Sequence, residues 1–185
     1  LVQVDEYKAA GEIFSADYVY FSSFSKSWLA HVLAYTDMIV DRMKLTSQSL
    51  VVEVASNDGY LLQYFQEKKI PCFGVEPSMG VAKAAMEKGL KVVTGFFGAS
   101  LARKLAAETG KVDLLIGNNV LAHVPDIRDF VNGIHDILKE DGVATLEFPH
   151  LMRLVAENQF DTVYHEHYSY LSLSTVCVVF EEFGL

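Results

Sequence analysis

Cysteine is scarce in this sequence, with only Cys72 and Cys177 among 185 residues. Two isolated thiols argue against a disulfide framework and against a zinc site built from several thiolates, and they are typical of a reducing cytosol. Long apolar runs are also missing, because no stretch reaches the roughly 20 residues that a membrane helix needs. The first residues do not resemble a signal peptide. These absences favour a cytoplasmic protein that has no membrane as a partner.

Positive charge is in short supply, since 15 Lys and Arg residues face 24 Asp and Glu residues and leave a net charge of −9. No cluster of basic residues exists to neutralise a phosphate backbone, so nucleic acid is not expected as a partner. Hydrophobic residues make up 51% of the chain and charged residues 21%. This composition is typical of a globular protein, and the length allows one sizeable core. The start without Met and the abrupt end at FEEFGL indicate a piece of a longer protein.

Apolar strands and amphipathic helices alternate along most of the chain. Strands are expected over residues 49–55, 72–77, 91–95, 112–118 and 143–148, after an opening helix over about 25–43. The later helices are expected to begin at Ser78, Ser100, Asp126 and Ser174. Gly89 is expected to end the helix that begins at Ser78. The pattern predicts an α/β fold, a Rossmann-like, doubly wound and mostly parallel sheet that is truncated after about five strands. Residues 1–48 are expected to pack over the site as an aromatic segment and helix, and residues 49–185 to form the α/β domain.

The carboxyl ends of the strands are where a doubly wound sheet binds its ligands. The loop after the first strand lacks the G-x-G-x-x-G that lets a pyrophosphate approach bare backbone. It carries one glycine, Gly59, after a polar Ser-Asn-Asp run and the acidic Glu53. Glu76 follows the second strand and is placed to accept both hydroxyls of a ribose, unless it is simply a solvated strand-end residue. A ligand with a ribose, a positive centre and no pyrophosphate is S-adenosyl-L-methionine.

The candidate cofactor residues all lie at strand ends. Phe96 or Phe97 is expected to touch the adenine, although two phenylalanines at such a place are also typical of a core. The full candidate set is Glu53, Ala55, Ser56, Asn57, Gly59, Glu76, Pro77, Ser78, Phe96, Asn118 and Asn119.

The octapeptide VYHEHYSY at residues 163–170 is dense in groups that do chemistry. Two histidines at i and i+2 in an extended stretch share one face, so His165 and His167 could bind a metal. No third ligand is evident, however, and a metal is therefore not expected. The tyrosines could also be one face of a half-buried strand with the histidines at its rim.

Five quoted motifs together carry a family resemblance: VVEVASNDGYLL, GVEPS, NNVLAHVPD, LEFPHL and FDTVYHEHYSYLS. Over about residues 14–185 the chain resembles class I S-adenosylmethionine-dependent methyltransferases. It is most similar to the C-methyltransferases of nucleotide-linked 4-keto-deoxysugars. It differs from these by lacking a four-cysteine zinc segment and by stopping before their further strands and C-terminal domain. The resemblance implies an enolate mechanism on a small-molecule substrate, a nucleotide-linked keto sugar.

The resemblance also implies roles for five residues. His167 is the candidate base with Glu166 assisting, while Tyr164 and Tyr18 line the sugar and polarise its ketone. His123 is a candidate acid or enolate stabiliser. Two other functions stay open, namely methyl transfer to oxygen or nitrogen of another small molecule, and a non-catalytic remnant that only binds the cofactor. A sheet that stops early leaves an edge, so we expect either a homo-oligomer or cover of the edge by residues 150–172.

Overall fold

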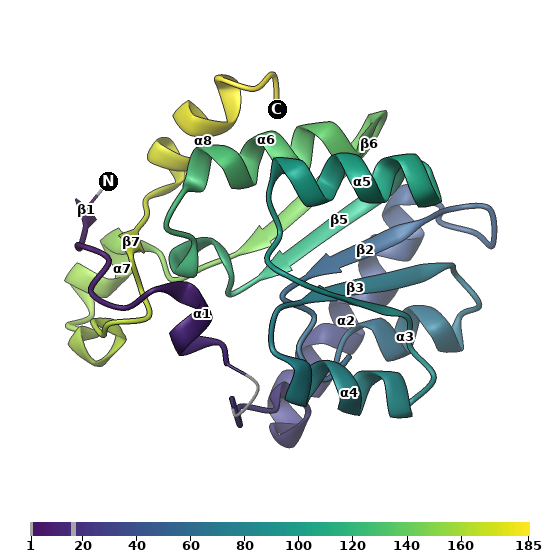
Figure 1. The fold of residues 1–185 in the computed structure, drawn as a ribbon, viewed down its shortest axis with the longest axis horizontal. Coiled ribbons are helices and arrows are strands. Elements are labelled where there is room, and N and C mark those ends of the chain that lie inside the picture. Colours follow the sequence, from purple (N-terminus) through teal and green to yellow (C-terminus); the bar gives the residue numbers. More distant parts are fainter. Residues whose placement is uncertain (1, 16–17) are drawn as a thin grey trace.

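The computed structural model describes residues 2–15 and 18–185. Its centre is a five-stranded parallel sheet with the order β4-β3-β2-β5-β6 (Figure 1). The strands are β2 (Val51–Val54), β3 (Cys72–Glu76), β4 (Val92–Thr94), β5 (Val112–Asn118) and β6 (Leu138–Glu147). The strand order reverses between β2 and β5, which makes their carboxyl ends the switch point where ligands bind. The predicted α/β class and parallel sheet are confirmed.

Successive residues of a strand point to opposite faces of the sheet, so both faces carry apolar side chains and both are covered by helices. Val52 and Val54 pack with α5 (Ala99–Thr109) and α6 (Ile127–Ile137), whereas Val51 packs with α2 (Lys26–Met43) and α3 (Leu62–Glu67). The remaining flanking helix, α4 (Met79–Glu87), follows β3 and lies on the α3 side (Figure 1). This double cover explains why the central strands are mostly apolar instead of alternating between apolar and polar residues.

The first and last strands of the described chain pair with each other beside the carboxyl ends of β5 and β6. β1 (Val2–Gln3) pairs antiparallel with β7 (Ser169–Tyr170), and α1 (Ala10–Ile13) follows β1 toward the sheet (Figure 1). Between β6 and β7 lie α7 (Leu151–Ala156) and the 3₁₀ helix Phe160–Thr162, while α8 (Leu173–Glu181) closes the chain against α6. The VYHEHYSY segment is thereby placed at the switch-point side of the sheet.

Two predicted helix starts differ from the structure, and a third lacks the expected side-chain cap. Ser172, and not Ser174, caps α8, because Ser172 is the extended residue after β7 and its hydroxyl accepts the Thr175 N–H at 3.3 Å. Gly98, and not Ser100, precedes α5. Ser78 does occupy the cap position of α4, but its hydroxyl donates to the Ser15 carbonyl at 2.8 Å instead of capping the helix.

The outer edge of β6 has no strand partner in the described parts of the chain, where β6 pairs only with β5. Residues 150–172 do not pair along this edge, since they fold beyond the end of the strand and form one parallel bridge, between His150 and Leu171. The expectation that residues 150–172 would cover the outer edge of β6 is therefore wrong. None of the helices in the described residues is both long and apolar enough to span a membrane.

Gly133 is expected to be essential for packing α6 against α5. A Cβ at this position would lie 2.8 Å from the backbone carbon of Gly98 and 3.1 Å from the Ala99 nitrogen. Gly133→Ala should therefore lower the free energy of unfolding by about 1–3 kcal/mol, although alanine is the better helix former. Urea unfolding measures this, with Asn132→Ala as the control in the same helix. Unchanged stability of Gly133→Ala would show that the two helices separate without cost.

Candidate active site at the carboxyl ends of the strands

A cavity of about 1400 Å³ opens at the carboxyl ends of the strands. Its volume exceeds the roughly 300–1,000 Å³ of a usual small-molecule pocket, so it can hold a cofactor together with a second molecule. Most predicted site residues lie on its wall: Ala55, Asn57, Glu76, Pro77, Phe96, Asn118 and Asn119 for the cofactor, and Tyr18, His123, Tyr164, Glu166 and His167 for the chemistry.

Four predicted cofactor residues, Glu53, Ser56, Gly59 and Ser78, lie behind that wall instead. The Ser56 side chain is packed against Gly74 of β3, and Gly59 has a positive φ of 76° and backs onto Leu90. Ser56 and Gly59 shape the loop after β2 without lining the cavity, because in that loop Ala55 and Asn57 face the cavity and Ser56 faces away from it. Sequence spacing does not distinguish the two orientations.

Glu76 is held at the end of β3 by two backbone N–H groups. Its Oε2 accepts the Asn57 N–H at 2.9 Å, and its Oε1 accepts the Ser78 N–H at 2.8 Å. Burial raises the pKa of this carboxyl, and the two hydrogen bonds oppose the rise. The carboxyl is thus fixed on the cavity wall, where its free lone pairs can accept further hydroxyl donors.

Glu53 is completely buried in β2, and neither of its carboxyl oxygens has a hydrogen-bond partner among the described residues. Desolvation therefore raises its pKa well above the ordinary value, with the Tyr60 hydroxyl acting in the opposite direction. Tyr60 lies on the cavity wall and separates Glu53 from the cavity. Contact between Glu53 and a ligand is consequently indirect in this structure.

Two imidazoles and a phenol form the centre of the opposite wall. The His167 Nδ1–H donates to the Thr162 carbonyl at 2.9 Å, and its Nε2 is 3.0 Å from the Tyr164 hydroxyl. The His123 Nδ1–H donates to the Glu166 carbonyl at 3.0 Å, and the two imidazole rings lie 4.6 Å apart, edge to face. Since a carbonyl only accepts, each Nδ1 carries the proton and each Nε2 keeps its lone pair.

The cluster is neutral at neutral pH. Burial and the neighbouring His167 lower the pKa of His123 from 6.5 to about 4, and burial also lowers the pKa of His167. Burial, with Glu166 nearby, raises the pKa of Tyr18 to about 12 and raises that of Tyr164. The Nε2 of His167 therefore stands next to the Tyr164 phenol, which keeps its proton, and this pair suits proton removal beside a developing oxyanion.

The lowered pKa of His123 predicts a loss of stability in acid. Between pH 6.5 and pH 4 the unfolded chain binds a proton at this residue that the folded chain refuses, so the free energy of unfolding falls as the pH falls. The loss attributable to His123 is up to about 3 kcal/mol and levels off below pH 4. Urea unfolding of the unsubstituted chain and of His123→Gln at pH 7 and pH 4.5 measures it. An equal acid loss in both proteins would contradict the prediction.

The two histidines of VYHEHYSY do not share a face. Residues 164–166 form a bend and a turn, so His165 is exposed while His167 is buried. The predicted extended stretch is wrong here, because the strand begins only at Ser169. In the described chain no three His, Cys, Asp or Glu side chains are grouped so that they could hold a metal ion.

Several cavity residues were not predicted as site residues. His31 of α2 lies on the wall, with its Nε2 2.9 Å from Glu147 Oε2 and its ring stacked on Trp28. Phe14 lies between Tyr18 and His123, at ring distances of 5.3 and 5.7 Å. The position of Glu147 at a strand end was the available signal; helix periodicity alone did not reveal His31.

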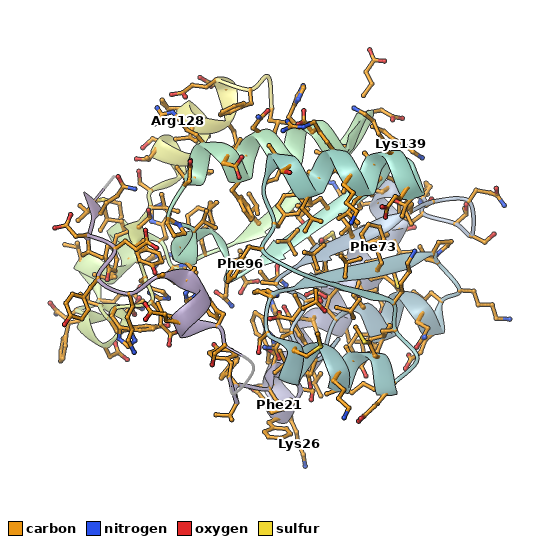
Figure 2. All side chains as sticks on the ribbon, viewed as in Figure 1. Phe21, Lys26, Phe73, Phe96, Arg128 and Lys139 are labelled. Atoms are coloured by element: carbon orange, nitrogen blue, oxygen red, sulfur yellow. The ribbon has the colours of Figure 1, made fainter. Side chains whose placement is uncertain are left out.

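The aromatic and acidic character of the wall fits a cationic adenosyl ligand. Phe96, near the centre of Figure 2, is 51% exposed and lies on the wall, and Phe97 also lies on the wall with its ring against Phe130. Among the described residues the wall contains no Lys or Arg, and its carboxylates are Glu76, Asp126, Asp129, Glu147, Asp161 and Glu166. Such a wall repels a pyrophosphate and attracts a sulfonium, so the residues fit S-adenosylmethionine.

Comparison with known proteins agrees with this geometry. The sequence profile described as a methyltransferase domain matches residues 29–185. The chain is 36% identical over 174 residues to the C-methyltransferase NovU of Streptomyces niveus. The alignment covers 94% of this chain and 41% of NovU. It therefore spans about two fifths of the length of that relative.

Two solved structures show the same fold. A SAM-dependent methyltransferase from Archaeoglobus fulgidus superposes with a TM-score of 0.67 at 16% identity, covering 84% of this chain and 68% of the other. The PH0226 protein of Pyrococcus horikoshii superposes with a TM-score of 0.70 at 16% identity, covering 95% and 89%. With its switch-point cavity, its cation-attracting wall and the matching family profile, the chain belongs to the methyltransferase domain family, and its cofactor is S-adenosylmethionine.

Proposed function

We propose that this domain methylates the carbon next to the ketone of a nucleotide-linked 4-keto-deoxysugar. The observation that carries the proposal is the pair formed by His167 Nε2 and the Tyr164 hydroxyl on the wall of the cavity that also contains Glu76. A carbon nucleophile needs a base and an oxyanion donor side by side, whereas methyl transfer to oxygen or nitrogen needs only a base. The 36% identity to a C-methyltransferase supports the same choice.

The cofactor half of the cavity is formed by the ends of β2 to β5. Glu76 would accept the ribose hydroxyls, Phe96 would lie against the adenine, and Asn118 and Asn119 would line the methionine end. S-adenosylmethionine supplies an electrophilic methyl group when bound. The protein's part is to hold the acceptor carbon in line with it and to exclude water.

The substrate half uses the neutral imidazole of His167 as the base. Its Nε2 takes the proton from the carbon beside the ketone, the electron pair of the broken C–H bond forms the enolate, and a tyrosine O–H donates to the enolate oxygen. Tyr164 and Tyr18 are the donors, since both phenols stay protonated. With a pKa of about 4, His123 is an uncharged imidazole at neutral pH and carries no imidazolium proton to donate, so we assign it to packing and polarity beside His167. The wall offers no cation for a diphosphate, so only the sugar is placed in the cavity.

Exchange of the substrate's α proton tests this function without methyl transfer. The protein, S-adenosylhomocysteine and a nucleotide-linked 4-keto-6-deoxysugar are incubated in deuterated water, and NMR follows the signal of the carbon-bound proton. Carbon methylation requires enzyme-catalysed exchange with deuterium. Binding of the sugar without exchange would favour transfer to oxygen or nitrogen, and cofactor binding without sugar binding would favour a non-catalytic remnant.

Self-association through the outer edge of β6 is also proposed. A strand with unpaired backbone groups is a template for a second chain, and β6 pairs on one side only within the described residues. Light scattering over a concentration series should give a mass above 20.6 kDa. A monomer at every concentration would contradict this proposal.

A further inference from the structure

One segment of the N-terminal region is hydrogen-bonded to the loop after β2 and to the start of α4, and we name its described residues, 15 and 18–25, the strap. The carbonyl of Ser15 accepts two hydrogen bonds, from the Ser78 hydroxyl at 2.8 Å and from the Tyr18 N–H at 3.2 Å. One end of the strap is thus tied to the start of α4, and the same carbonyl places Tyr18.

The other end of the strap is tied to Asn57. The Asn57 Oδ1 accepts the Ser22 N–H at 2.9 Å, and its Nδ2 donates to the Tyr20 carbonyl at 2.9 Å. The neighbouring Asp58 carboxylate accepts the Ser23 hydroxyl. The amide of Asn57 thus uses one N–H and one lone pair for the strap, while the residue also lies on the cavity wall, where it was expected to bind the cofactor.

Both anchors depend on the same carboxylate. Glu76 accepts the backbone N–H of Asn57 with one oxygen and that of Ser78 with the other, while the side chains of these two residues hold the strap. Glu76, which we assign to the ribose, is therefore hydrogen-bonded directly to both residues that anchor the strap. A ligand that draws Glu76 into new hydrogen bonds acts on both ends of the strap at once.

Tyr18 lies between the two anchors on the cavity wall. Its ring contacts Phe14, and Phe14 contacts His123 of the imidazole cluster. The strap thereby connects the cofactor end of the cavity to the substrate end.

We infer that Ser78 and Asn57 are positioning residues, which couple occupation of the ribose site at Glu76 to the placement of Tyr18 over the substrate half of the cavity. The inference rests on the proposed function for the ribose site at Glu76 and for the role of Tyr18. Cofactor binding should order the strap, and the cofactor should therefore bind before the methyl acceptor.

Hydrogen exchange of the strap tests the coupling, with S-adenosylhomocysteine as the probe and Ser78→Ala as the variant. In the unsubstituted protein the ligand should slow exchange of the amides of residues 18–25. In Ser78→Ala these amides should exchange about 2- to 10-fold faster with ligand bound, the range expected for one lost hydrogen bond. Ser78→Thr keeps the hydroxyl and should restore the protection. The dissociation constant of the ligand, measured by calorimetry, should rise by no more than the same roughly 2- to 10-fold, since coupling is reciprocal and Ser78 itself is not on the cavity wall.

Three results would overturn the inference. They are no protection of the strap by the ligand, equal protection in Ser78→Ala, and a large loss of ligand affinity in Ser78→Ala, which would make Ser78 a cofactor residue. Asn57→Gly is the second variant, because glycine accepts the positive φ of 49° at this residue and removes only the amide. Neither measurement needs a methyl acceptor, so failure of the proposed reaction leaves this test intact.

Discussion

Replacing His167 by asparagine is expected to lower turnover by about 10²–10⁴-fold, the contribution of a positioned general base. Asparagine can keep the hydrogen bond to the Thr162 carbonyl with its side-chain N–H, so the turn that carries the residue should persist. What it loses is the Nε2 lone pair that faces Tyr164. Turnover of a nucleotide-linked keto sugar, together with α-proton exchange, measures the loss.

His165→Asn is the matched control for this substitution, because it changes the same residue type two positions away on an exposed side chain. It should leave turnover within about 3-fold. The affinity for S-adenosylhomocysteine should be alike in both variants, since the cofactor half of the cavity is untouched. Near-normal turnover of His167→Asn would exclude His167 as the base and would leave His123 as the next candidate for that role.

Removing the carboxylate of Glu76 should weaken binding of S-adenosylhomocysteine by roughly 10²-fold or more. Two hydrogen bonds from ribose hydroxyls to a charged acceptor contribute about 1.5–3 kcal/mol each, and 3 kcal/mol corresponds to about 10²-fold in affinity. Glu76→Ala also leaves the N–H groups of Asn57 and Ser78 without their present acceptor. Isothermal titration calorimetry gives the dissociation constant directly.

Asp161→Ala is the control for the general loss of a negative charge from the cavity wall. Its affinity for the neutral thioether ligand should stay within about 3-fold of the unsubstituted protein. Circular dichroism of Glu76→Ala should show the folded α/β protein, so that weak binding is not confused with unfolding. An affinity for Glu76→Ala equal to that of the control would show that the ribose lies elsewhere.

The fold was predictable from the sequence because its signals are local. The mostly apolar run around Val51–Val54, interrupted only by Glu53, indicates a strand buried on both faces, and Asp126 begins α6 as its side chain predicts. The position of Glu76 at a strand end follows from the same reading, since all parallel strands end at one side of the sheet. Helix starts were less certain where two serines compete, as at Ser172 and Ser174.

The sequence by itself determined the sheet, the side on which ligands bind and the chemical groups available there. Only the tertiary structure decided which groups meet. His123 and His167 are brought together by packing between distant segments, Glu53 lies off the cavity wall, and Asn57 on that wall holds the strap with its side chain. The reason is physical: periodicity reports which face of an element is buried, whereas a hydrogen-bond partner depends on contacts between segments far apart in the chain.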